Sequence, residues 1–250
     1  EYTIRNYSWF IEKFLKNSKK NIEQLSEEDV KNFIAAIMEE KATSTISLGF
    51  SSLKFFFNEI LKKPLSIKLP KKEKKLPEVL TKEEVKMLVE NASTKKSKLI
   101  ILLLYSSGIR VSELINLKRK DLDFNSNIGW VRRGKGKKDR IFQLPDKIIV
   151  LLKGYFEKTP EYTYVLSKEK PLTTRNIQKI IKKINIKTGI NKKVTPHILR
   201  HSYATHLLDS GVDIRYIQTL LGHENLSTTQ IYTHVSHEAL KKIKNPLDSL

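Results

Sequence analysis

The sequence predicts a mainly α-helical protein of two domains, the second of which also contains a small antiparallel β-sheet. Apolar residues recur at helical spacing through most of the 250 residues, whereas residues 121–144 carry short apolar runs that flank a turn. A segment rich in Pro and Lys interrupts the helical pattern and leaves on each side a part large enough for its own core. We therefore expect an N-terminal helical domain at residues 1–63, a linker at 64–78 and a C-terminal α+β domain at 79–250.

Three helices are expected in the first domain. Ser26 with Asp29 resembles a cap and predicts the start of the second helix. The third helix should run from about Thr43 to Leu61. The apolar side chains that repeat at helical spacing, and that we expect in the core, are Ile4, Tyr7, Phe10, Ile11, Phe14 and Leu15, then Val30, Phe33, Ile34, Ile37 and Met38, then Ile46, Phe50, Leu53, Phe56, Phe57 and Ile60.

The segment from Lys62 to Pro77 differs in composition from its flanks, because it holds three prolines and seven lysines. Proline breaks helices and like charges repel, so an extended chain is predicted. Two interpretations stay open for it: a solvated spacer, or a strap that lies along nucleic-acid phosphates.

The second domain is expected to begin at Thr81, which forms a capping box with Glu84. Residues 97–106 are apolar on all sides and predict a buried helix that ends at Gly108, and a further helix should follow Arg110 directly. Two strands are expected next, at 128–131 and 140–144, around a turn at 134–139. Helices should follow at about 146–157, at about 173–187, after Thr195 with Pro196, from Asp213 to Gly222, and after Ser227 with Gln230.

The chain is strongly basic, with 47 Lys and Arg against 27 Asp and Glu and a formal charge of +20. The excess is uneven, at +4 over residues 1–78 and +16 over residues 79–250. Such a field favours a polyanion such as nucleic acid. Cysteine is absent, which excludes disulfides and thiolate metal sites. The longest apolar run, Leu99 to Tyr105, is too short for a bilayer and no signal peptide is visible, so we expect a cytoplasmic protein without membrane contact.

Four segments hold the residue types that indicate chemistry. They are, in order, G-I-R-V-S-E-L with Arg110, G-K-G-K-K-D-R with Lys135, H-I-L-R-H-S-Y-A-T-H-L-L with His197 and Arg200, and L-G-H-E-N-L-S-T-T-Q-I-Y-T-H-V with His223 and Tyr232.

Together these segments resemble the tyrosine recombinases, and most closely their Xer branch, over nearly the whole chain. The resemblance implies a helical core-binding domain, a catalytic domain, and attack of Tyr232 on double-stranded DNA to form a 3′-phosphotyrosine and then a Holliday junction, with no cofactor or metal. It further implies four copies of the chain on two DNA sites, with the tail at 238–250 docking on a neighbour; packing of the tail on its own domain is the alternative. The implied catalytic residues are Arg110, Lys135, His197, Arg200, His223 and Tyr232.

The residue types suit this chemistry. The planar guanidinium group of arginine stabilises the extra negative charge of a pentavalent transition state. Each arginine taken alone could instead form a salt bridge, for example to Glu113 or Asp209. A tyrosine hydroxyl, with a pKa of about 10, needs a base or a positive site, which histidines can supply. The lysine would protonate the leaving 5′-oxygen, and its flanking glycines let the backbone approach a phosphate; a plain basic turn is the alternative.

Parts of this region also fit other interpretations. His197 and His201 are spaced for zinc, but Arg200 between them would repel a cation, and we expect His201 and His206 to pack helices. The segment from Asp213 to Tyr232 also resembles a helix-turn-helix.

The resemblance implies resolution of chromosome dimers at a dif-like site, and a Lys-rich, Cys-free composition fits an archaeal member. A phage or mobile-element integrase is the nearest alternative function. A type IB topoisomerase-like enzyme and an inactive DNA-binding protein are more distant ones.

Overall fold

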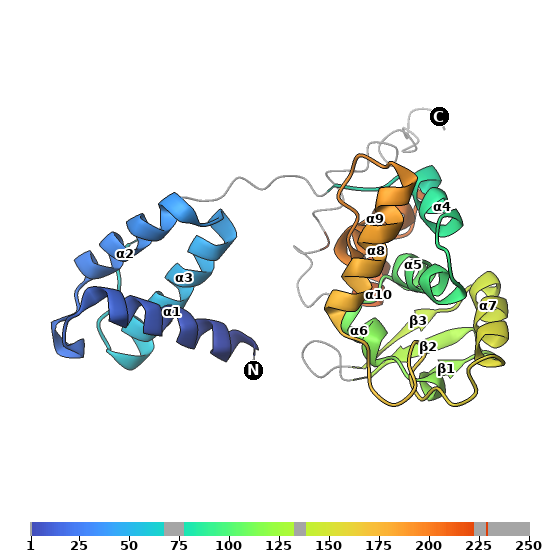
Figure 1. The fold of residues 1–250 in the computed structure, drawn as a ribbon, viewed down its shortest axis with the longest axis horizontal. Coiled ribbons are helices and arrows are strands. Elements are labelled where there is room, and N and C mark those ends of the chain that lie inside the picture. Colours follow the sequence, from blue (N-terminus) through green and yellow to red (C-terminus); the bar gives the residue numbers. More distant parts are fainter. Residues whose placement is uncertain (1, 68–77, 133–138, 223–228, 230–250) are drawn as a thin grey trace, which may run out of the picture. The chain divides into compact units, whose positions relative to one another are not determined.

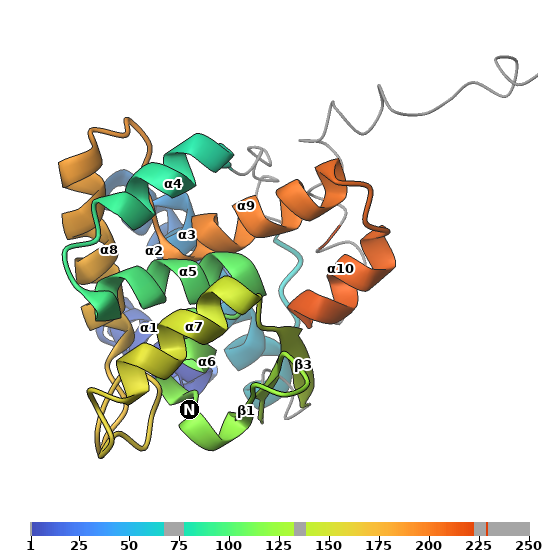
Figure 2. The same ribbon diagram turned by 90° about the vertical axis from the view of Figure 1, so that its right-hand side faces the viewer.

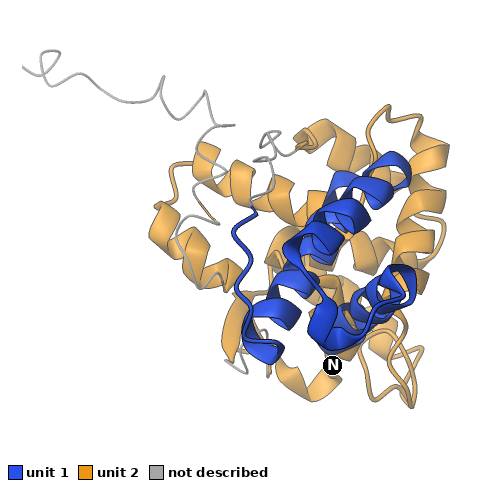
Figure 3. Cartoon of the chain, turned by 90° about the vertical axis from the view of Figure 1, so that its left-hand side faces the viewer, with its two compact units in different colours: residues 1–74 blue, residues 75–250 orange. Residues whose placement is uncertain are grey.

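The computed structural model describes residues 2–67, 78–132, 139–222 and 229. The chain divides into two compact units, residues 1–74 and 75–250, which Figure 3 shows in different colours. Helices make up most of both units and the second unit also holds a three-stranded antiparallel sheet (Figure 1). The predicted fold class is therefore confirmed. No helix among the described residues is long and apolar enough to cross a membrane.

The first unit is built from helices around an aromatic core. Its elements are α1 (Tyr2–Ser18), a 3-10 turn (Ile22–Gln24), α2 (Glu27–Glu40), α3 (Thr43–Phe55) and a short π-helix (Phe56–Ile60). Ser26 forms the predicted capping box with Asp29 at the start of α2. Phe14 lies at the centre of the core, where its ring meets those of Phe33 and Phe57 edge-on.

Four predictions for the first unit need correction. Ile4, Met38 and Ile60 were expected in the core, but they are among its exposed apolar side chains. Each lies within three residues of the end of its element, where periodicity does not reveal whether a neighbouring helix covers the side chain. The third helix also does not stay α-helical to Leu61, because it changes to a π-helix at Phe56.

The second unit has seven α-helices and three strands within its described residues. The helices are α4 (Lys82–Glu90), α5 (Lys95–Ser107), α6 (Val111–Asn116), α7 (Asp146–Phe156), α8 (Thr174–Thr188), α9 (Pro196–Asp209) and α10 (Ile214–Leu221).

The sheet pairs β1 (Leu122–Asp123), β2 (Ile128–Val131) and β3 (Arg140–Gln143) in that order, antiparallel throughout. Arg140 opposes Val131 at the end of the β2–β3 ladder. The predicted strand positions are confirmed.

The apolar helix α5 lies in the middle of the second unit, with α4, α6, α7, α8 and α9 packed around it (Figure 2). Thr94 caps its start, and the left-handed Gly108 (φ 58°) ends it. A Cβ on Gly108 would come within 2.6 Å of the Tyr203 ring, so only glycine fits this turn. The turn brings Arg110, the N-cap residue of α6, close to α9 and α10.

Local signals set the ends of α9 and α10. The Thr195 hydroxyl accepts a hydrogen bond from the Ile198 amide at 3.2 Å, and Pro196 occupies the first helical position. Asp213 caps α10, which ends at the left-handed Gly222. These caps are the ones predicted from the sequence.

Candidate active site

Arg110 and Arg200 approach the same helix end from different parts of the chain. Arg110 Nη2 donates to the carbonyl oxygen of Gly222 at 3.2 Å. Arg200, on α9, is buried, and its Nη2 donates to the carbonyl oxygen of Leu221 at 2.6 Å while its Nη1 donates to that of Gly108. The two candidate phosphate-binding residues therefore share one anchor although 90 residues separate them in the chain.

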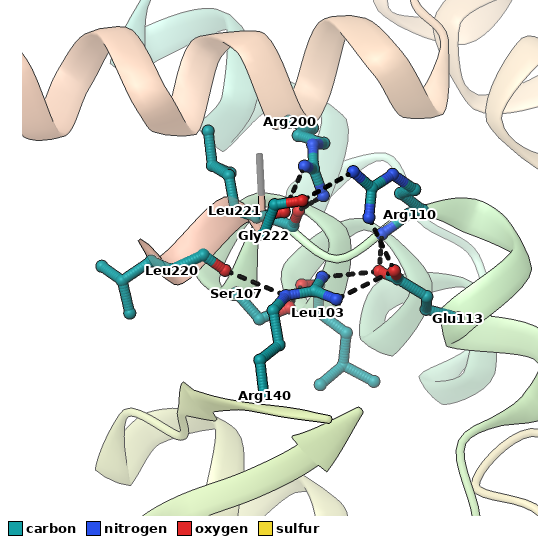
Figure 4. Close-up of polar contacts among 10 residues, drawn as sticks. Leu103, Ser107, Arg110, Glu113, Arg140, Arg200, Leu220, Leu221 and Gly222 are labelled. Atoms are coloured by element: carbon teal, nitrogen blue, oxygen red, sulfur yellow. Dashed lines mark hydrogen bonds and ion pairs between the residues drawn. The ribbon is translucent and has the colours of Figure 1, made fainter. Parts of the chain in front are cut away.

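A third arginine completes this anchor. Arg140, at the start of β3, donates from Nε to the carbonyl oxygen of Leu220 at 3.1 Å. Three successive carbonyls at the end of α10 thus each accept a hydrogen bond from a different arginine (Figure 4). The end of a helix leaves such carbonyls without helical partners and carries partial negative charge, which favours cations.

Glu113 lies between Arg110 and Arg140. Its carboxylate accepts from Arg140 Nη1 and Nη2 at 2.9 and 2.6 Å, from Arg110 Nη1 at 2.9 Å and from the Arg110 amide at 2.7 Å. Burial alone would raise the pKa of Glu113, but these hydrogen bonds and the charge of Arg140 outweigh it and lower the pKa to about 2. Glu113 is therefore a carboxylate at any physiological pH and holds both arginines.

All three histidines of α9 have lowered pKa values. Desolvation, and then the positive charges of Arg200 and Arg110, lower the pKa of His197. One turn further along, burial and the charges of His197 and Arg200 lower the pKa of His201 to about 4. His206 has a structural contact, since its Nδ1 lies 2.7 Å from the Tyr105 hydroxyl.

Of the six predicted site residues, the structure brings together Arg110, Arg200 and His197. The other three, Lys135, His223 and Tyr232, lie outside the described residues, as do the predicted cap at Ser227 and the tail at 238–250. In sequence, His223 follows Gly222 directly.

Sequence reasoning missed the roles of Glu113 and Arg140 at this site. Glu113 had been considered only as a salt-bridge partner that would make Arg110 structural, and that salt bridge exists at 2.9 Å. The capping-box spacing of Arg110 and Glu113 was a signal for their contact. No local signal linked Arg140 to Glu113. Among the described residues, no group of three His, Cys, Asp or Glu side chains could hold a metal ion.

Comparisons with known proteins place this fold and its arginine-rich site in a class of DNA strand-transfer proteins. The phage integrase family model matches residues 78–239, and the model for the phage integrase N-terminal SAM-like domain matches residues 1–67. The chain belongs to the phage integrase family, the tyrosine recombinases, whose members cleave and rejoin DNA through a tyrosine intermediate.

Its relatives include Xer recombinases. Tyrosine recombinase XerA of Thermococcus kodakarensis is 40% identical over 252 residues, which cover 96% of this chain and 87% of that protein. XerA of Pyrococcus furiosus is 41% identical over 251 residues, covering 96% and 86%. Tyrosine recombinase XerC of Staphylococcus epidermidis is 36% identical over 266 residues, covering 97% and 90%.

Solved structures agree with this assignment. A crystal structure of XerA recombinase is 33% identical, with a TM-score of 0.62 over 97% of this chain and 90% of that one. The XerH site-specific recombinase bound to a palindromic difH substrate is 25% identical, with a TM-score of 0.81 over 96% and 78%.

Proposed function

We propose that this protein recombines DNA at dif-like sites, with Tyr232 as the nucleophile that forms the 3′-phosphotyrosine. The convergence of Arg110 and Arg200 on the end of α10 is the observation that carries the proposal. Two guanidinium groups bonded to adjacent backbone carbonyls can bind the two non-bridging oxygens of one phosphate. The dif-like site is supported by the XerA relatives and by the XerH structures with difH.

The reaction exchanges one phosphoester for another. The Tyr232 oxygen attacks phosphorus, Arg110 and Arg200 stabilise the negative charge that builds on the non-bridging oxygens, and the 5′-oxygen leaves with a proton from Lys135. His197, whose lowered pKa keeps its imidazole neutral, can accept the tyrosine proton. His223 is the second imidazole of the site. The free 5′-hydroxyl of one duplex then attacks the phosphotyrosine of the other.

The proposed assembly is a tetramer on two DNA sites, with residues 238–250 docking on a neighbouring copy. Apolar residues Leu240, Ile243, Leu247 and Leu250 recur in this tail between lysines, and a segment so short buries too little surface to be stable alone. The net charge of +16 over residues 79–250 supports tight and salt-sensitive DNA binding.

A nicked suicide substrate tests the nucleophile. The wild-type protein should accumulate a covalent protein–DNA adduct, in EDTA and without nucleotide, because the proposed site uses neither. Tyr232→Phe removes only the hydroxyl and should abolish the adduct while DNA binding persists. Tyr216→Phe, at an exposed tyrosine of α10, is the matched control and should form adduct normally. Adduct in Tyr232→Phe, or loss of cleavage on chelation with binding intact, would contradict the proposal.

A further inference from the structure

Arg140 is one of the three arginines that bond the carbonyls at the end of α10. All three of its guanidinium nitrogens are hydrogen-bonded, two to Glu113 and one to the Leu220 carbonyl. Its side chain is 11% exposed, against 22% for Arg110. A bidentate arginine–carboxylate pair has one preferred geometry. Arg140 therefore fixes the orientation of the Glu113 carboxylate and, through it, of the groups bonded to that carboxylate.

Those partners hold the two proposed phosphate-binding arginines. Glu113 bonds Arg110 on one side and Arg140 on the other. The carbonyl that Arg140 binds directly precedes those that bind Arg200 and Arg110. Figure 4 shows this ring of contacts, in which Arg140 reaches from β3 towards both Glu113 and the end of α10.

We propose that Arg140 is a positioning residue, which fixes Arg110 and Arg200 for the scissile phosphate by holding Glu113 and the end of α10. This inference rests on the proposed function, because it assumes that Arg110 and Arg200 bind that phosphate. Arg140 itself does not contact the phosphate. Its effect passes through the carboxylate and the helix end.

The contacts explain how loss of Arg140 would act. Glu113 is nearly buried and needs cationic partners, because an uncompensated buried carboxylate is costly. Without Arg140, Arg110 is the remaining guanidinium bonded to Glu113 among the described residues. The carboxylate can then form a bidentate contact with the Arg110 guanidinium and draw it away from the Gly222 carbonyl. A displacement of about 1 Å is enough to slow a positioned reaction by about 10²-fold.

The test compares single-turnover cleavage by Arg140→Gln on two suicide substrates at saturating protein. On the normal phosphate we expect a loss of about 10-fold or more. On a substrate whose scissile group is a methylphosphonate, the charge that the arginines stabilise is absent, and we expect the difference from wild type to shrink to about 3-fold or less. A residue that only supports the fold would slow both substrates alike.

Arg132→Gln is the matched control. Arg132 follows β2 in the same sheet and pairs through Nε with the buried carboxylate of Asp121 at 2.8 Å, as Arg140 pairs with Glu113. It touches none of the three carbonyls in the structure, so its removal should leave the cleavage rate of bound DNA within about 3-fold.

The double variant Arg140→Gln with Glu113→Gln gives an independent measurement. Substitutions within one network are generally not additive. The rate loss of the double variant should therefore not exceed the product of the two single-variant losses. If Glu113 pulls Arg110 out of place when Arg140 is absent, the double variant should cleave faster than that product predicts. If Arg140→Gln does not fold, Arg140→Lys carries the test. It keeps the charge but cannot bridge Glu113 and Leu220 together, and should show a smaller loss with the same substrate dependence.

The outcomes separate this inference from the proposed function. A folded Arg140→Gln protein that cleaves at the wild-type rate, or is slowed equally on both substrates, overturns the positioning role. If Arg110→Ala also cleaves normally, the proposed function fails instead. A rate loss in Arg110→Ala with none in Arg140→Gln leaves the proposed function standing and rejects only the role of Arg140.

Discussion

The two units of this protein bury different kinds of side chain. In the described part of the first unit, the one fully buried polar residue is Ser52, and the core is built from aromatic and aliphatic groups. The second unit buries Arg200 and Asp121, and nearly buries Glu113 and Arg140. Charges that leave water carry a desolvation cost that pairing only partly offsets, so the second unit maintains its ionic network at some expense to stability. The first unit is thus organised for packing, whereas the second is organised around a charged site.

The largest expected effect is on chemistry. Arg200→Ala should lower the rate of strand cleavage by about 10²–10³-fold, because one donor to the transition-state charge is lost. DNA affinity should fall far less, as a binding titration at constant salt would report. If weaker binding explained the whole defect, Arg200 would be a phosphate anchor and not a catalytic group.

Arg119→Ala is the control for that variant. Arg119 also donates to two backbone carbonyls, those of Thr159 and Pro160, both at 3.0 Å, and it packs on the Phe156 ring. Its loss should reduce stability without a comparable loss of the cleavage rate of bound DNA.

The second prediction concerns packing in the first unit. Phe14→Ala should lower the free energy of unfolding of this unit by about 3–5 kcal/mol, because a large, fully buried ring leaves a cavity. The chain has two tryptophans, Trp9 in the first unit and Trp130 in the second. Single-tryptophan variants therefore allow each unit to be followed separately by fluorescence in urea.

The Trp130 transition should be almost unchanged in Phe14→Ala. Phe55→Ala removes a ring that is about half exposed and should cost much less than Phe14→Ala in the Trp9 transition. Equal costs for the two would mean that the aromatic core is not what stabilises the first unit.

A smaller effect is expected from a methyl group at the end of α10. Gly222→Ala forces alanine into a left-handed conformation (φ 63°) and places Cβ within 2.9 Å of Arg140 Cδ. The backbone strain costs about 1 kcal/mol. Displacement of Arg140 should add a loss in cleavage rate of about 10-fold. Gly211→Ala carries a similar strain (φ 87°) but meets no atom within 4 Å, so it should lower stability without slowing cleavage.

The last expected effect is a difference in pH response between the two units. Burial first, and then two neighbouring positive charges, lower the pKa of His201 to about 4 in the folded protein. Its contribution to stability is therefore present above the unfolded value near 6.5 and is lost as pH falls towards 4. All six histidines lie after residue 196, so the first unit has none.

Between pH 6.5 and pH 4, the melting temperature reported by Trp130 should therefore fall more than the melting temperature reported by Trp9. His201→Gln should reduce the slope with which the Trp130 melting temperature changes with pH in this range. An unchanged slope in His201→Gln would assign the pH response to other groups.

Much of the fold was predictable because its signals are local. Thr81, Thr195 and Asp213 each cap the next helix within three residues, and Gly108 and Gly222 end helices where predicted. Local hydrogen bonds need only the right residue at the right spacing. For the same reason Arg110, His197 and Arg200 could be picked out as candidate site residues from the short motifs that contain them.

The network around them depends on contacts between distant parts of the chain. Arg140 lies 27 residues from Glu113 and 80 from Leu220, and neither periodicity nor capping patterns hold information about such pairs. Likewise, only packing decided that Met38 is exposed while Ile37 is buried. Local sequence signals were enough for most helices, for the caps at their ends and for the residue types of the candidate site. The tertiary structure alone decided which charges share a carboxylate, because burial and ion pairing depend on where separate elements meet.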